Sequence, residues 1–256
     1  MGEEVATRWR HPAAGALAAG ALIVSGCGGS PGERSAGRSA GHRCTPGTVR
    51  ALGSPSLAYA AVVRSRAGAY RRPGAVRIAR FRHYNVNGVP TVLGIRAAVL
   101  GRDCRAAWYR VQLPIKPNGA TGYVRARDVN VGTVRTRIAV DLSQRRLTFY
   151  RDGRPLMRIR VGIGAGATPT PTGSFFVNQR FVEDPSGPYG PAALGISAHS
   201  TVLTWWAQGG PVAIHGTNQP STIGRAASNG CIHMPNAILR RLFRMTPAGT
   251  PVVIRA

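Results

Sequence analysis

Short runs of alternating apolar residues, each closed by glycine, asparagine or proline, recur from about residue 45 to the C-terminus. A period of two places successive side chains on opposite faces of a strand. In the second half this pattern continues across a predicted turn at Asp152–Gly153. Its apolar positions are Ile138, Val140, Leu142, Leu147, Phe149, Met157, Ile159 and Val161. The pattern predicts antiparallel strands with one buried face. We therefore expect a mainly β chain.

Residues 45–133 carry two hairpin signals, Asn87–Gly88 and Asn118–Gly119, between short β-rich runs. Trp108 and Tyr123 suit half-buried strands, and a small β-barrel is the expected fold of this region. The stretch WYRVQLPIKPNGATGYVRARDV is similar to the Src-homology-3-like modules that bacteria attach to wall enzymes. That similarity implies either wall binding or packing against a neighbouring domain, and both stay open.

Residues 134–256 form the second predicted domain, a β-rich unit with one short helix. Asn236 is expected to cap a helix that runs through Arg244, because an asparagine side chain accepts a hydrogen bond from the first helical turn. The apolar stripe of this helix is Ile238, Leu239, Leu242 and Phe243. Pro247 and Gly249 end the helix, and TPVVIR gives a final strand.

The N-terminal 26 residues read as a secretory signal peptide, with two arginines ahead of an apolar run that is too short to span a bilayer. The run ends in Val-Ser-Gly-Cys, which is similar to the bacterial lipobox, so Cys27 is the predicted lipidation site. An unlipidated signal peptide is the alternative. Residues 27–44 lack apolar periodicity and read as a flexible tether. We expect the mature chain on the wall side of the plasma membrane.

The formal net charge of +25 is almost entirely due to arginine. For an exported protein this charge indicates anionic membrane surfaces or acidic wall polymers as surroundings, and not nucleic acid.

Four cysteines are present. In an oxidising compartment Cys44 and Cys104 can pair, with two free thiols as the alternative. Cys231 is left over between two histidines, His215 and His233. A thiol becomes a good nucleophile only when a base takes its proton, so either histidine is a candidate partner.

Three interpretations of Cys231 stand against one another: a nucleophile, a zinc ligand with the two histidines, and a buried structural thiol. Catalytic zinc needs three protein ligands, but no Cys-x-x-Cys or His-x-x-His pair is present. We therefore predict no metal. A glycine before the cysteine permits a sharp turn, so that the amides of Gly230 and Cys231 could form an oxyanion hole.

The span from Ile138 to Ile254 resembles the catalytic domain of bacterial L,D-transpeptidases of the YkuD type, a β-sandwich. The matching motifs occur in family order: IAVDLSQRRLTFY, VGIGAGATPTPTGSF, PYGPAALGIS, AIHGT, SNGCIHM and GTPVVI. The resemblance implies that Cys231 is the nucleophile, that His215 is its base, and that the Gly216 carbonyl orients the imidazole. It assigns the shape of the catalytic turn to Ser228, Asn229 and Gly230.

Two positions depart from the family pattern. Asn229 stands where the family often has histidine, and His233 stands where it usually has arginine. An arginine could bind a substrate carboxylate bidentately, whereas a neutral imidazole could not. The resemblance further implies a lid over the cleft between residues 181 and 210, in which Tyr189 and Trp205 could contact substrate. Packing of Trp205 and Trp206 in the core is the alternative. The turn that begins at Thr170 is expected to have a structural role.

The function implied by the resemblance is cross-linking or modification of peptidoglycan stem peptides through a cysteine acyl-enzyme, without a cofactor. Carbapenems acylate the same thiolate in this family. Water in place of an amine as acceptor would make the protein an L,D-carboxypeptidase, and sequence does not separate these outcomes. A non-catalytic wall-binding lipoprotein is the third possibility.

Overall fold

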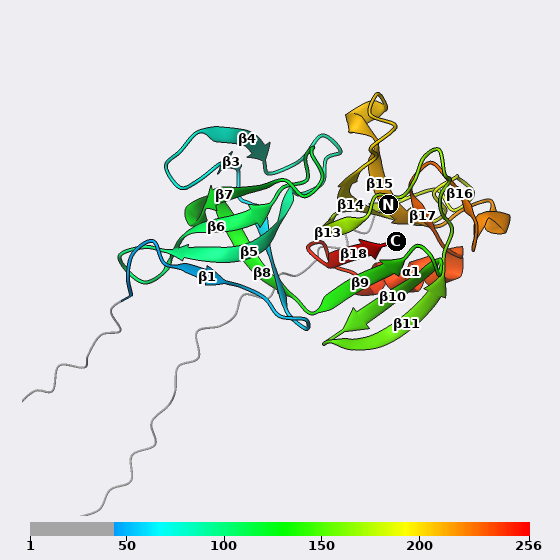
Figure 1. The fold of residues 1–256 in the computed structure, drawn as a ribbon, viewed down its shortest axis with the longest axis horizontal. Coiled ribbons are helices and arrows are strands. Elements are labelled where there is room, and N and C mark those ends of the chain that lie inside the picture. The colour runs from blue at the N-terminus through cyan, green and yellow to red at the C-terminus, as the bar shows by residue number, and fades with distance from the viewer. Residues whose placement is uncertain (1–43) are drawn as a thin grey trace, which may run out of the picture.

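The computed structural model describes residues 44–256 of the 256-residue chain (Figure 1). The predicted signal peptide, the lipidation site Cys27 and nearly all of the predicted tether lie outside the described residues. Within residues 44–256, no helix is long and apolar enough to cross a membrane.

The fold is mainly β, as the alternating pattern predicts, and its strands form two eight-stranded sheets and one two-stranded sheet. Figure 1 shows the two large sheets side by side, the first built from residues before Arg135 and the second from residues after it. The predicted runs therefore became strands in both halves of the described chain.

The first sheet has the strand order β4-β3-β7-β6-β5-β2-β8, with β1 paired to β5. The tight turns at Gly88 and Gly119 have positive φ angles of 73° and 81°, which explains the glycine at each. A barrel shape for this sheet stays a prediction. Its elements are β1 Val49–Ala51, β2 Ala58–Val63, β3 Arg66–Tyr70, β4 Arg77–Arg82, β5 Val92–Leu100, β6 Ala106–Gln112, β7 Thr121–Arg125, the 3-10 turn η1 Ala126–Asp128 and β8 Val129–Val134.

The second sheet has the order β11-β10-β9-β18-β13-β14-β15-β17, so the last strand of the chain lies in its middle. The pairs β9–β18 and β15–β17 are parallel, and the other neighbouring pairs are antiparallel. Its strands are β9 Thr136–Asp141, β10 Arg146–Arg151, β11 Arg154–Arg160, β13 Gly173–Val182, β14 Ala192–His199, β15 Pro211–His215, β17 Ile232–His233 and β18 Pro251–Arg255.

Four shorter elements accompany the second sheet. The strands β12 (Ile163–Gly164) and β16 (Ala226–Ser228) pair in parallel. The 3-10 turns η2 (Ala207–Gly209) and η3 (Pro220–Thr222) follow β14 and β15 along the chain.

The core of the second sheet contains the residues that the alternation selects. Ile138, Val140, Leu147 and Phe149 are buried together, in one cluster with the apolar residues of β13, β14 and β15. The predicted turn at Asp152–Gly153 has positive φ at both residues, as a tight hairpin with a right-handed strand twist requires.

The helix α1 (Asn236–Met245) forms at the predicted place, with Leu239 and Leu242 fully buried. The predicted capping role of Asn236 is wrong. Pro235 occupies the cap position, and the Asn236 side-chain oxygen accepts a hydrogen bond from the Thr217 amide at 2.8 Å. A side-chain oxygen used by a distant loop is not available to the first turn of its own helix.

The two large sheets are joined by a shared apolar cluster and by buried hydrogen bonds. Ala60, Val92 and Val134 of the first sheet pack with Phe176 of the second. The Gln112 side chain donates to the Ser174 carbonyl at 2.6 Å. A Cβ added at Gly249 would lie 2.3 Å from the Cβ of Ala60, so only glycine fits this approach.

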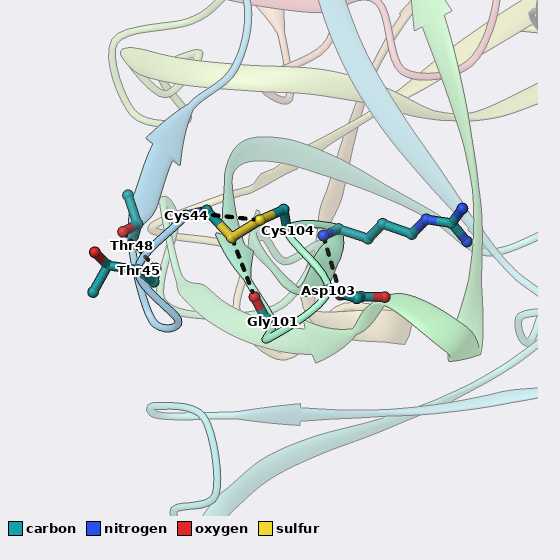
Figure 2. Close-up of a disulfide and its surroundings, with 7 residues drawn as sticks. Cys44, Thr45, Thr48, Gly101, Asp103 and Cys104 are labelled. Atoms are coloured by element: carbon teal, nitrogen blue, oxygen red, sulfur yellow. Dashed lines mark hydrogen bonds between the residues drawn. A yellow bond between two sulfur atoms is a disulfide. The ribbon is translucent and has the colours of Figure 1, made fainter. Parts of the chain in front are cut away.

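A disulfide joins Cys44 to Cys104, 60 residues further along the chain (Figure 2). It ties the first described residue to the loop between β5 and β6. The Cys44 amide also donates to the Cys104 sulfur at 3.2 Å. The described chain therefore begins attached to the first sheet.

Candidate active site

The parallel pair β15–β17 brings the two histidines and the free cysteine together. Ile214 is paired with Ile232, and His215 with His233. The imidazole rings of these paired histidines have centroids 4.6 Å apart. Cys231 directly precedes β17 and lies beside Ala213, whose amide hydrogen-bonds to the thiol.

His215 is held in one tautomer by the residue that follows it. Its side chain is 3% exposed, and Nδ1 lies 2.6 Å from the Gly216 carbonyl oxygen. A carbonyl can only accept a hydrogen bond, so Nδ1 carries the proton and Nε2 keeps its lone pair. The interaction that the resemblance implied for Gly216 is therefore present in the structure, and it leaves a basic nitrogen on the opposite edge of the ring.

His233 is fixed in the same way by a threonine. The Thr222 hydroxyl donates its proton to the Gln219 carbonyl at 2.7 Å, so towards His233 it acts as an acceptor. The proton of His233 is then on Nδ1, 3.2 Å from that hydroxyl. Burial lowers the pKa of His233, which makes the ring neutral at pH 7. A neutral ring here does not reproduce the charge of an arginine.

The candidate nucleophile and base are both uncharged at neutral pH. Burial, followed by the neighbouring His233, lowers the pKa of His215 to about 4. Burial also raises the pKa of the Cys231 thiol, although the Ala213 amide opposes this shift. The resting pair is therefore a thiol and a neutral imidazole, and a thiolate arises by proton transfer and not as a preformed ion pair.

The turn before Cys231 is closed by the hydroxyl of Ser228. This hydroxyl donates to the Cys231 carbonyl at 2.6 Å and accepts from the Gly230 amide at 3.1 Å. We expected the Gly230 amide to point into the cleft as an oxyanion donor, and the structure contradicts that expectation, because Ser228 already accepts it. Gly230 has a φ of 111°, a conformation that favours glycine.

Thr170, expected to be structural, supports this turn from a distant loop. Its buried hydroxyl donates to the Gly230 carbonyl at 3.0 Å and accepts from the Gly164 amide at 2.9 Å. Thr168 adds a second support by donating to the Ser228 carbonyl at 3.0 Å. The conformation of the turn thus depends on residues 60 positions earlier in the chain.

Sequence reasoning missed the contribution of Asn236 to the site. Its oxygen holds the Thr217 amide, immediately after the Gly216 carbonyl that orients His215. A Cβ at Gly216 would lie 2.2 Å from the same oxygen, so the loop passes too close for any other residue. Its position at the start of the helix predicts a capping role. Only the contact with the Thr217 amide in the folded chain shows that the side chain supports the site instead.

Cys231 and Asn229 line a cavity of about 590 Å³. Tyr189 also lines it, with its ring centroid 4.8 Å from that of His215. Burial and the nearby Cys231 raise the pKa of the Tyr189 phenol. Trp206 lines this cavity, whereas Trp205, which we expected to contact substrate, is 78% exposed and packs edge-on against Trp206. Trp206 is thus the better candidate of the two.

No group of three or more histidine, cysteine, aspartate or glutamate side chains within residues 44–256 is arranged to hold a metal ion. What the described residues do bring together is a thiol, a neutral imidazole with a free Nε2, and a backbone turn beside a cavity. This is the arrangement of a site for nucleophilic chemistry by cysteine.

Comparison with known proteins agrees with this class of site. The sequence profile of the L,D-transpeptidase catalytic domain, YkuD, matches residues 135–254. A protein of Bacillus licheniformis named as a candidate L,D-transpeptidase YkuD is 37% identical over 125 residues, which cover 49% of this chain and 68% of that protein. Its counterpart in Bacillus subtilis strain 168 is 34% identical over 122 residues, or 48% of this chain and 67% of that protein. This chain belongs to the YkuD family of L,D-transpeptidases.

Solved structures of L,D-transpeptidases are also similar. A crystal structure of a cysteine-to-serine mutant of the Enterococcus faecium enzyme is 28% identical, with a TM-score of 0.37, over 47% of this chain and 49% of that one. An enzyme from Mycobacterium smegmatis is 16% identical, with a TM-score of 0.40, over 77% of this chain and 99% of that one. The match thus spans about half the length of the enterococcal protein.

Proposed function

We propose that this protein is an L,D-transpeptidase that acts on peptidoglycan stem peptides through an acyl-enzyme on Cys231. The observation that carries the proposal is the tautomer of His215, whose Nε2 is left basic on the strand beside Cys231. The family membership given above supports the same activity. We also propose that the chain works outside the cytoplasm, where this substrate is, and that it is anchored by a lipid at Cys27, for which the Val-Ser-Gly-Cys sequence is the support.

In the first half of the reaction, His215 Nε2 takes the thiol proton as the sulfur attacks the carbonyl carbon of the stem's third residue. The tetrahedral intermediate places a negative charge on the former carbonyl oxygen. We assign the stabilisation of this oxygen to the Cys231 amide, since the Gly230 amide is bound to Ser228. The protonated imidazole then gives its proton to the leaving nitrogen, and D-alanine departs.

In the second half, an amine of a neighbouring stem attacks the thioester, and His215 accepts its proton. The amide bond forms as the carbon–sulfur bond breaks, and the proton returns to the sulfur. Water in place of the amine gives hydrolysis instead. The buried imidazole with a pKa of about 4 stays available as a base throughout the neutral pH range.

We also propose that the two sheets correspond to two functional units, residues 45–133 and 134–256. The first unit packs on the second through the Phe176 cluster, which supports a role in building the site. The net charge of +25, which is that of the whole chain, supports contact of the protein with anionic wall polymers or membrane surfaces.

The test is intact-protein mass spectrometry after incubation with a carbapenem, applied to the wild type, C231A and H215Q. We expect one adduct on the wild type, none on C231A, and adduct formation at least 100-fold slower on H215Q, since the proton acceptor is lost. A wild-type protein that stays unmodified, or a C231A variant that is modified equally, would refute the mechanism. An unmodified wild-type protein would favour a wall-binding protein without activity.

The acceptor is identified in a second assay with a stem tetrapeptide and an added amine. We expect a cross-linked product in excess of the hydrolysed tripeptide. If only the tripeptide forms at saturating amine, the protein is a carboxypeptidase that uses the same acyl-enzyme.

A further inference from the structure

A second cavity of about 680 Å³ lies between the two sheets. From the first sheet it is lined by Arg80 and Arg82 of β4, whose side chains share one face because they are two positions apart on a strand. From the second sheet it is lined by Asn178 and His199. No part of the proposed mechanism uses this cavity.

The two cavities have opposite charge. The residues that line the Cys231 cavity include no arginine, lysine or histidine among residues 44–256, and Glu183 is their only charged side chain. The described residues around the second cavity include two arginines and no carboxylate. The positive charges that could bind the carboxylates of a peptide therefore lie beside the catalytic cavity and not inside it.

The two cavities are adjacent and share part of their walls. Gln179 and Gln208 line both. Asn87, from the first sheet, bridges these two side chains: its amide donates to Gln179 at 2.7 Å, and its oxygen accepts from Gln208 at 2.8 Å. Because Asn87 itself lines the Cys231 cavity, the first sheet contributes directly to the cleft wall.

The walls of the second cavity also contain unused polar atoms. Asn178 is 9% exposed and occupies a bulge in β13, and its side-chain oxygen has no hydrogen-bond partner within residues 44–256. Nδ1 of His199 also has no hydrogen-bond partner within residues 44–256. Burial and the nearby Lys116 lower the pKa of this imidazole. Unpaired buried polar atoms are costly, so the hydrogen bonding of this wall is incomplete.

We infer that the second cavity is a subsite that binds the carboxylate-bearing part of a stem peptide, with Arg80 and Arg82 as the carboxylate ligands. This inference rests on the proposed function. Arginine binds carboxylates bidentately, which the neutral imidazole of His233, next to His215, cannot do. The first sheet thus supplies the positive charge that recognises the substrate, and the second sheet supplies the reacting groups.

The inference is tested by calorimetric binding to the full C231A chain, which cannot turn the ligand over. The probes are a synthetic tetrapeptide stem that ends in D-alanine and carries free carboxylates, and the same peptide with its carboxylates amidated. The variant R80Q/R82Q removes the two arginines of the cavity. The matched control R72Q/R77Q removes two charges from the same hairpin at residues that do not line the cavity.

We expect C231A to bind the carboxylate peptide at least fivefold more tightly than the amidated one. In the R80Q/R82Q background the two affinities become equal, whereas in R72Q/R77Q the preference is kept. An unchanged preference in R80Q/R82Q, an equal loss in the control, or no preference in C231A overturns the inference.

Carbapenem adduct formation on proteins that retain Cys231 separates the two proposals. The wild type and the control R72Q/R77Q should form the adduct at the same rate, and urea unfolding checks that R80Q/R82Q is folded. A normal adduct together with no carboxylate preference overturns only the subsite. An absent adduct on the wild type overturns the proposed function.

Discussion

Replacing His215 by glutamine should remove a pH-dependent loss of stability that the wild type shows in mild acid. The pKa of this imidazole falls from 6.5 to about 4 on folding, because burial and the neighbouring His233 penalise its charged form. Between those two values the unfolded chain binds more protons than the folded chain. Stability is therefore complete above about pH 6.5 and decreases as the pH falls towards 4.

The size of this effect follows from the distance between the two pKa values, 6.5 and about 4. The full cost well below pH 4 is about 3 kcal/mol. Between pH 7 and pH 5 the expected loss from this group is about 2 kcal/mol. Because the side chain is only 3% exposed, screening by solvent reduces this figure little.

Urea unfolding followed by tryptophan fluorescence at pH 7, 6 and 5 measures the effect. We expect the wild-type free energy of unfolding to fall by about 2 kcal/mol more than that of H215Q over this interval. C231A keeps the imidazole and should follow the wild type. Equal pH dependence in the wild type and H215Q would show that the imidazole is not buried in its neutral form, and the argument for a neutral resting pair would fail.

Three further substitutions test the supports of the site and of the first sheet. Thr170→Val leaves the Gly164 amide and the Gly230 carbonyl unpaired, so the free energy of unfolding should fall by about 2 kcal/mol and carbapenem acylation should become slower. Thr172→Val, at an exposed position, should change neither quantity. Replacing both bridged cysteines by serine should lower the urea-derived free energy of unfolding by about 4 kcal/mol, because the disulfide closes a loop of 60 residues. Asn236→Ala removes the acceptor of the Thr217 amide and should slow acylation several-fold, as measured by mass spectrometry over time.

Much of the strand structure could be predicted because it is encoded locally. Ile138 and Val140 alternate with polar residues, and a period of two has one simple explanation when one face of a sheet is buried. Asp152–Gly153 is likewise a local signal, since both residues must adopt positive φ. Neither inference needs knowledge of what the strand packs against.

The support of the site could not be predicted, because it depends on contacts between distant segments. Thr170 reaches Gly230 across 60 residues, and nothing in the composition of either segment indicates that pair. Asn236 shows the same limit more sharply: its position before a helix favours a cap, and only the folded chain places the Thr217 amide within reach of its oxygen. The prediction that the Gly230 amide is an oxyanion donor is wrong for a related reason, since the hydroxyl of Ser228, two residues earlier, accepts its hydrogen bond.

The contacts between the sheets bear on what the first sheet can do. A module that only holds the wall would need no close fit to its neighbour, yet the Gly249 backbone approaches Ala60 so closely that a Cβ there would clash. The Asn118 side chain makes two hydrogen bonds of 2.8 Å with the backbone of His199, the last residue of β14. Such contacts fix the first sheet against the cleft, and Asn87 then becomes part of the cleft wall. This packing supports the proposal that the first sheet takes part in substrate recognition, and wall attachment alone does not account for it.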